Sequence, residues 1–182
     1  MLPTSVTLCV AAVAASLLAL GATPAFGGTY FSVGATGASI STSTGNVALS
    51  ANFSDQWHGT KIRILSTQVE RRFKLADGYM IAPSLSLGHN VVGAFATDDA
   101  AAGLRVAKQL NKSFGLDAGV QLGRTFRASA PGADGAYRSA FVGADYKLGR
   151  GYLAVTYSET KFPAAIGSWN LKGVSVGYQF AF

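Results

Sequence analysis

The chain has little cysteine, proline or charge. Of its 182 residues, Cys9 is the single cysteine and five are prolines. Charged residues make up 13% of the chain, against about 25% in a typical soluble domain. A disulfide-stapled scaffold is excluded, because one cysteine cannot form a disulfide within the chain. The composition also argues against a disordered tail and against a soluble module with a strongly charged surface.

Long apolar runs are absent after the amino terminus. Leu8–Leu20 is an uncharged run of 13 residues, and the small residues Ala25 and Gly27 follow it at the spacing of a signal-peptidase site. This run is too short for a membrane-spanning helix, which needs about 20 residues. We therefore expect residues 1–27 to be a secretory signal peptide cut after Gly27, or alternatively after Ala25. Cys9 would be removed together with the signal peptide.

From Gly28 onward the chain alternates between apolar and polar residues. In residues 114–126 the even positions are apolar except Arg124, and the odd positions are small or polar. Because successive side chains of a strand point to opposite faces, such segments are predicted to be strands with one apolar face. The same pattern occurs in residues 79–88, 103–110, 139–148 and 173–182.

The polar faces of these strands are rich in Gly, Ala and Ser. A soluble β-barrel would carry Lys, Glu and Thr on its polar face, because that face meets water. Glycine weakens a strand unless another group approaches closely, so a small-residue face indicates a crowded interior. The apolar face is then predicted to meet lipid, as in a transmembrane barrel. A secreted soluble barrel with an apolar ligand inside would need the opposite arrangement.

Short turn signals recur about 35 residues apart, which is room for two membrane strands and their connections. They lie at Ala76–Gly78, Asn111–Ser113 and Gly149–Gly151. Longer connections are expected at residues 38–59, 89–99, 128–136 and 161–168. The prediction is an all-β fold: a closed, antiparallel, up-and-down transmembrane β-barrel of about eight strands over residues 28–182. Alternation in Val47–Phe53 leaves ten strands open, although we interpret it as a hairpin beyond the membrane.

The alternation continues to the last residue, with Tyr178, Phe180 and Phe182 on the apolar face. Here the chain resembles the bacterial outer-membrane β-barrel proteins, and in particular their small eight-stranded type, similar to the OmpA transmembrane domain and OmpX. In that family the final strand ends in an aromatic residue that the barrel-insertion machinery reads. The resemblance implies an integral outer-membrane protein, surrounded by lipid and lipopolysaccharide, with that machinery as a partner.

Six charged residues are expected in the barrel interior. An isolated buried charge is very costly, so these side chains should pair with one another in an ion-pair network. A small pore is the alternative interpretation of the same set. The residues are Glu70, Arg72, Lys74, Arg105, Asp117 and Asp145.

The formal net charge is +6. The basic residues form no stripe with interleaved aromatics, so nucleic acid is not an expected partner. Several of them fall at the long-loop side, where we expect Arg124 and Arg127 to contact lipopolysaccharide phosphates. Solvated strand-end charges are the equal alternative.

No catalytic, metal or cofactor site is predicted. His58 and His89 are the only histidines, and the odd separation of Ser86 from His89 puts the two on opposite faces of a strand. A structural or surface-interaction role, similar to adhesion, is the first expectation for function. A narrow, porin-like channel for ions or small solutes is the alternative, and an outer-membrane lipid-modifying enzyme is the weakest one.

Overall fold

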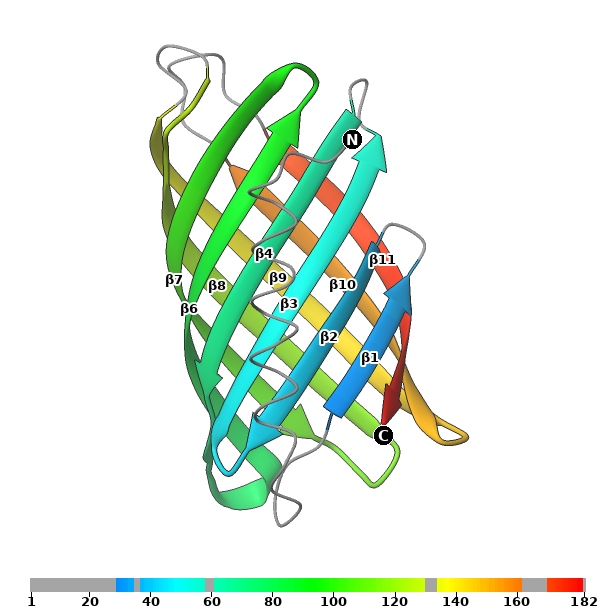
Figure 1. Cartoon of the computed structure of the whole chain (residues 1–182). Coiled ribbons are helices and arrows are strands. Elements are labelled where there is room, and N and C mark those ends of the chain that lie inside the picture. Colours follow the sequence, from blue (N-terminus) through cyan, green and yellow to red (C-terminus); the bar gives the residue numbers. More distant parts are fainter. Residues whose placement is uncertain (1–28, 35–36, 58–60, 130–133, 162–169, 182) are drawn as a thin grey trace.

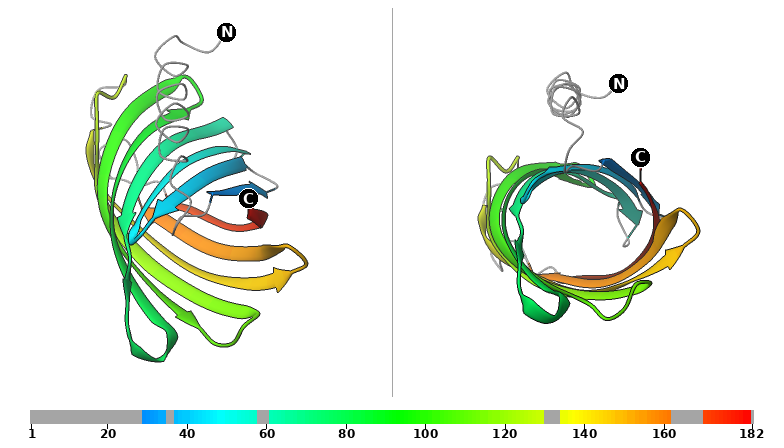
Figure 2. Two further views of the ribbon diagram at one scale, coloured as in Figure 1. Left: turned by 60° about the horizontal axis from the view of Figure 1, so that its bottom comes forward. Right: turned by 90° about the horizontal axis from the view of Figure 1, so that it is seen from below.

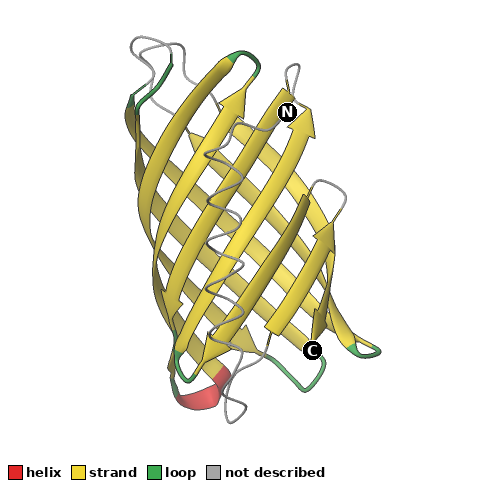
Figure 3. Cartoon of the chain, in the orientation of Figure 1, coloured by secondary structure: helices red, strands yellow, loops and turns green. Residues whose placement is uncertain are grey.

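A computed structural model describes residues 29–34, 37–57, 61–129, 134–161 and 170–181. The predicted signal peptide lies outside the described residues. Almost all of the described chain is β-strand, as Figure 3 shows, with one short 3₁₀ turn, η1 (Ala76–Gly78). In this part of the chain no helix is long and apolar enough to cross a membrane.

Eleven strands follow one another within the described ranges (Figure 1). The first five are β1 (Thr29–Gly34), β2 (Gly37–Thr44), β3 (Val47–Trp57), β4 (Lys61–Arg71) and β5 (Phe73–Lys74). The others are β6 (Tyr79–Val92), β7 (Phe95–Gln109), β8 (Phe114–Phe126), β9 (Gly135–Leu148), β10 (Gly151–Lys161) and β11 (Asn170–Ala181).

Except for β4 and β5, which both pair with β6, strands that are consecutive in the chain pair antiparallel, so the sheet has a simple up-and-down order. The pairing passes from β4 directly to β6, and it returns from β11 to β1. Viewed along its axis in Figure 2, the sheet curls into a ring. We call the end where β1 begins and β11 ends, at the bottom of Figure 1, the lower end.

The seam between β1 and β11 is the weakest part of the ring. Only five residue pairs, from Tyr30–Ala181 to Gly34–Gly177, join these two strands, whereas 11 pairs join β10 and β11. Among the described residues, the upper part of β11 pairs with β10 alone. The wall of the barrel is therefore shorter at β1 and β2 than elsewhere (Figure 1).

The strand number corrects the expected eight. Since β5 lies directly after β4 and pairs with the same strand, β6, the eleven strands fill ten positions in the wall. The two additional strands are β2 and β3, which occupy the segment expected to be a long loop at residues 38–59. Their hairpin turns at Gly45, whose φ of 57° is left-handed and suits glycine.

The expected loop at residues 89–99 is also wrong. β6 and β7 continue through it in register to the pair Val92–Phe95, and a turn at Gly93 connects them. The expected connection at residues 161–168 lies, apart from Lys161, outside the described residues, and the remaining ones are confirmed. Turns at residues 76–78, 110–113 and 149–150 all lie at the lower end, together with the β2–β3 turn, and the upper β8–β9 connection falls at residues 127–134.

The inside-out assignment of the two faces is confirmed by neighbouring residues of one strand. Leu85 and Leu87 of β6 are each 62% exposed on the outside, whereas Ser86 between them is 8% exposed and faces the lumen. Other large apolar residues repeat this pattern around the ring, including Leu122, Val142 and Val174. Most residues of the inner face are small or polar, so the apolar outer face is the one that suits lipid.

Glycines of β8 make room for the two large aromatic side chains that β9 sends inward. A Cβ at Gly119 would overlap the ring of Phe141, and a Cβ at Gly123 would overlap the ring of Tyr137. Each glycine lies opposite its aromatic partner in the β8–β9 register. The small residues of the polar face are thus required by close approach, as the sequence indicated.

We expect Leu85→Arg to lower the free energy of unfolding by about 2–4 kcal/mol, because it puts a charge on the lipid face near the middle of a strand. The matched change Leu75→Arg, in the lower turn between β5 and η1, should cost about 1 kcal/mol or less. Urea unfolding in lipid vesicles measures both values. Equal costs at the two positions would contradict the lipid-facing assignment.

Candidate functional site

The lumen contains a cavity of about 300 Å³. One side of it is uncharged, with Ser39, Ser41, Ser50, Asn52 and Gln179 from β2, β3 and β11. The other side carries charge from β4 and β7. These two walls differ because β2, β3 and β11 present only small or amide side chains inward, among the residues described.

Glu70 is the centre of the charged wall. It is 7% exposed, and its carboxylate accepts two hydrogen bonds from Arg105: Nη2 to Oε1 at 2.7 Å and Nε to Oε2 at 3.0 Å. Arg72 donates a third, from Nε to Oε1 at 2.8 Å. A bidentate arginine–carboxylate pair is strong and fixes its geometry, so it compensates for the removal of Glu70 from water.

The pair Glu70–Arg105 crosses a strand. Glu70 lies on β4 and Arg105 on β7, and β6 lies between them in the sheet. The residues of β6 opposite them are small: Ser84 opposes Glu70, and Ala82 opposes Arg105. Ala82 is completely buried. The two long side chains therefore meet in the space above these small residues of β6.

The network continues to Asp117 on β8, whose Oδ2 lies 3.7 Å from Nη1 of Arg105. Asp117 opposes Gly143 of β9, and Asp145 of β9 opposes Gly115 of β8. A Cβ at Gly115 would lie 2.6 Å from Oδ1 of Asp145, and a Cβ at Gly143 would overlap the Asp117 carboxylate. Each aspartate thus lies flat over a glycine of the next strand.

The structure brings together four of the six residues that the sequence placed inside: Glu70, Arg72, Arg105 and Asp117. Asp145 lies beside them over Gly115. Lys74 is exposed on the two-residue β5 near the lower end, and among the described residues it has no ion pair.

A second buried polar group lies higher in the lumen and was missed from the sequence. Asp99 of β7 is 8% exposed and accepts hydrogen bonds from Asn90 Nδ2, at 2.6 Å, and from the hydroxyl of Tyr137. A Cβ at Gly88, opposite Asp99, would overlap its carboxylate. Strand parity would have placed these residues inside if β6 and β7 had been extended through residues 89–99.

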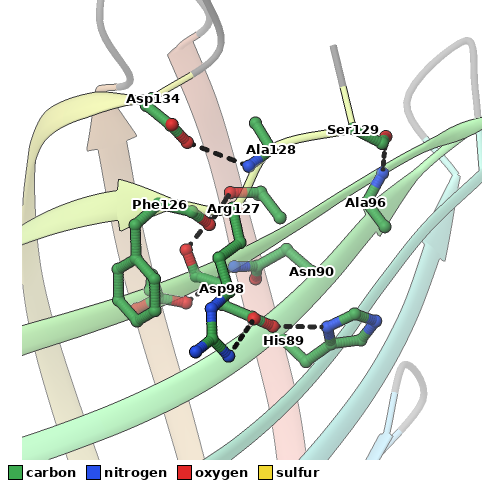
Figure 4. A network of polar contacts seen from close by, with 11 residues as sticks. His89, Asn90, Ala96, Asp98, Phe126, Arg127, Ala128, Ser129 and Asp134 are labelled. Atoms are coloured by element: carbon green, nitrogen blue, oxygen red, sulfur yellow. Dashed lines mark hydrogen bonds and ion pairs between the residues drawn. The ribbon is translucent and has the colours of Figure 1, made fainter.

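A network of polar contacts covers the upper end of β6 and β7, on the outer face (Figure 4). Nδ1 of His89 lies 2.8 Å from Oδ1 of Asp98, and Nη1 of Arg127 lies 3.8 Å from Oδ2 of Asp98. In the same network, the backbone N–H of Ala96 donates a hydrogen bond to Oγ of Ser129, at 2.8 Å. These contacts attach the β8–β9 connection to the top of β7.

The predicted lipopolysaccharide contacts, Arg124 and Arg127, are in different situations. Arg124 is exposed on the outer face of β8, and no described residue forms an ion pair with its side chain. Arg127 follows β8 and is 80% exposed, but Asp98 partly neutralises it. Their contact with lipopolysaccharide stays a prediction.

No catalytic arrangement is evident among the described residues. Ser86 faces the lumen, where its Oγ accepts a hydrogen bond from Gln121, whereas His89 is on the outer face. Within the described ranges, no three His, Cys, Asp or Glu residues gather as a metal site would require. His58 lies outside the described residues.

The terminal aromatics lie at the lower end of β11. The rings of Tyr178 and Phe180 meet edge to face, with centroids 4.7 Å apart, and the hydroxyl of Tyr178 donates to the carbonyl of Leu148. This hydroxyl ties the last strand to the β9–β10 turn. Phe182 lies outside the described residues, and the role of the three aromatics as an insertion signal stays a prediction.

Comparison with known proteins identifies the fold. No family model and no curated protein sequence matches the chain. A bacterial polysaccharide outer-membrane secretin is similar in structure, with a TM-score of 0.52 and 12% identity over 80% of this chain and 57% of that one.

A loop-deletion mutant of OmpT from Vibrio cholerae is less similar, with a TM-score of 0.43 and 14% identity over 80% of this chain and 53% of that one. Ail from Yersinia pestis has a TM-score of 0.46 and 9% identity over 86% of this chain and 100% of that one. The chain spans about half the length of the Vibrio protein. The likeness to the secretin assigns the outer-membrane β-barrel fold.

We expect Glu70 and Arg105 to be energetically coupled. Glu70→Gln or Arg105→Gln alone should lower the free energy of unfolding by about 2–4 kcal/mol, because each removes the bidentate ion pair that compensates for burying the remaining charge. The double variant should cost less than the sum by at least about 1 kcal/mol. Chemical unfolding measures this double-mutant cycle. A cycle of Glu70 with the unpaired Lys74 serves as the control, and an equally large coupling there would contradict the direct pairing.

Proposed function

We propose that this chain is an integral protein of the bacterial outer membrane and forms a narrow hydrophilic channel for ions and small polar solutes. The observation that carries the proposal is the polar cavity of about 300 Å³ inside a ring of ten strand positions. An eight-stranded barrel is just wide enough for side chains to fill it, and two more strands widen the interior.

The arrangement of charge in the lumen supports a water-filled path. The residues Glu70, Arg72, Arg105 and Asp117 come from the contiguous part of the sheet from β4 to β8, so their network follows one wall instead of bridging the lumen. The Ser, Asn and Gln side chains that line the rest of the cavity, from β2, β3 and β11, offer hydrogen bonds without fixed charge. A polar path lined partly by charges and partly by neutral polar groups is suited to small hydrated solutes.

The outer surface supports the membrane location. Large apolar side chains are exposed all around the ring, on strands far apart in the sequence. A soluble protein rarely exposes so extensive an apolar surface, because it would associate with other apolar surfaces. In lipid the same surface is at its lowest free energy, and the polar interior is kept from the hydrocarbon.

A structural or surface-interaction role is the second candidate. Loops on a rigid scaffold usually carry recognition, and the β8–β9 connection is held in place by hydrogen bonds. The upper connections are short, however. The longest have eight residues, between Phe126 and Gly135 and between Lys161 and Asn170, and residues 93–94 alone connect β6 and β7. Such connections offer little area for adhesion.

The channel proposal predicts discrete conductance steps in a planar lipid bilayer. Under a KCl gradient, Asp117→Asn should shift the reversal potential toward anion selectivity, and Arg105→Gln should shift it toward cation selectivity, because each removes one lumen charge. Arg150→Gln, in the lower β9–β10 turn, is a control that should leave selectivity unchanged. Wild-type protein that inserts but conducts no more than bare lipid would exclude the channel and leave the structural role.

A further inference from the structure

The upper ends of β8 to β11 carry four basic residues on the outer face: Arg124, Arg138, Lys161 and Lys172. Each lies on the same face of its strand as exposed apolar residues such as Leu122, Val142 and Val174. Each is also within four residues of the upper end of its strand. They form a cationic row where the apolar band of the outer wall ends.

Neighbours in this row are close. Lys161 lies directly opposite Arg138 in the β9–β10 register, and Arg138 is diagonal to Arg124, which opposes Ala136. Directly opposed side chains on one face have Cβ atoms about 5 Å apart, and diagonal ones about 7–8 Å. Like charges at such distances repel one another, so the row is favourable only when an anion neutralises it.

One carboxylate, that of Glu159, contacts the cationic row. Glu159 lies 3.1 Å from Nζ of Lys161 and 3.6 Å from Nζ of Lys172, and it accepts a hydrogen bond from Asn170. It makes no contact of this kind with either arginine. Among the described residues Arg124 and Arg138 have no ion pair, and four cations against one carboxylate leave a formal charge of +3.

The rest of the upper rim is closer to neutral. Lys61 pairs with Asp55 at 3.1 Å, and Asp55 also opposes Arg63 in the β3–β4 register. On β6 and β7, Asp98 contacts both His89 and Arg127. Lys61 and Arg63 against Asp55 leave a formal charge of +1 on β3 and β4, so the larger excess, of +3, is on β8–β11, and Arg127 is not part of it.

We propose that Arg124, Arg138 and Lys161 bind the phosphate groups of the lipid A moiety of lipopolysaccharide in the outer leaflet. Arginine recognises phosphate through paired N–H donors, and lysine adds a point charge. The position at the edge of the apolar band is the level of lipid headgroups. This end of the barrel is opposite the start of β1, the end of β11 and the short turns at residues 110–113 and 149–150, and it is the outer side in this fold. The site depends on the membrane location and is independent of conduction.

The test compares wild type with the triple variant R124Q/R138Q/K161Q and with the control K112Q/K147Q/R150Q, which removes three exposed cations from the lower end. Purified proteins in detergent are titrated with bisphosphorylated lipid A, with dephosphorylated lipid A and with phosphatidylglycerol, and bound lipid is counted by native mass spectrometry. Heat-modifiable gel mobility verifies that each barrel is folded.

We expect the triple variant to bind bisphosphorylated lipid A at least about tenfold more weakly, because charge-assisted hydrogen bonds are lost, while the control stays within about twofold of wild type. Dephosphorylated lipid A should bind weakly to all three proteins. If the triple variant does not fold, Arg138→Gln alone should still weaken binding several-fold.

Three results would overturn the proposal. The first is unchanged lipid A binding by the folded variant, and the second is an equal loss in the lower-end control. The third is a parallel loss of phosphatidylglycerol binding, which would indicate a general anionic-lipid surface.

Discussion

The closed hydrogen-bond ladder is the constraint on which this molecule depends. In hydrocarbon no water is present to satisfy a free N–H or C=O, so a β-sheet can span a membrane only if its two edge strands pair with each other. Here the ring closes through the five residue pairs between β1 and β11. Once it is closed, strand pleating sends alternate side chains to lipid and to the lumen, and every other feature follows this division.

Inside, the limited space decides how charge is accommodated. Asp99, Asp117 and Asp145 each lie over a glycine of the neighbouring strand, and Glu70 meets Arg105 above the small Ala82 and Ser84 of β6. Small residues on one strand thus make room for long or charged residues on the next. The charges pair within the part of the sheet from β4 to β8, whereas β2, β3 and β11 line the cavity with neutral side chains.

Outside, the same alternation separates two polar regions from the apolar band. At the upper rim, the contacts around Asp98 balance charge and attach the β8–β9 connection, whereas the row on β8–β11 keeps an excess of positive charge. At the lower end, Tyr178 ties the last strand to the β9–β10 turn. The lumen network and the cationic row share β8 but use its opposite faces, so they can act independently.

The all-β class, the lipid-facing side and three of the four lower turns were determined by the sequence alone, because two-residue alternation and turn residues are local properties. The strand number was not. β2 reads GASISTST, in which Ile40 is the one large apolar residue, and the Gly- and Asp-containing ends of β6 and β7 resemble a loop. Only pairing with long neighbours makes these segments strands. Parity also placed Glu70 and Arg105 inside, but their meeting across β6 was decided by the tertiary register, which no local pattern contains.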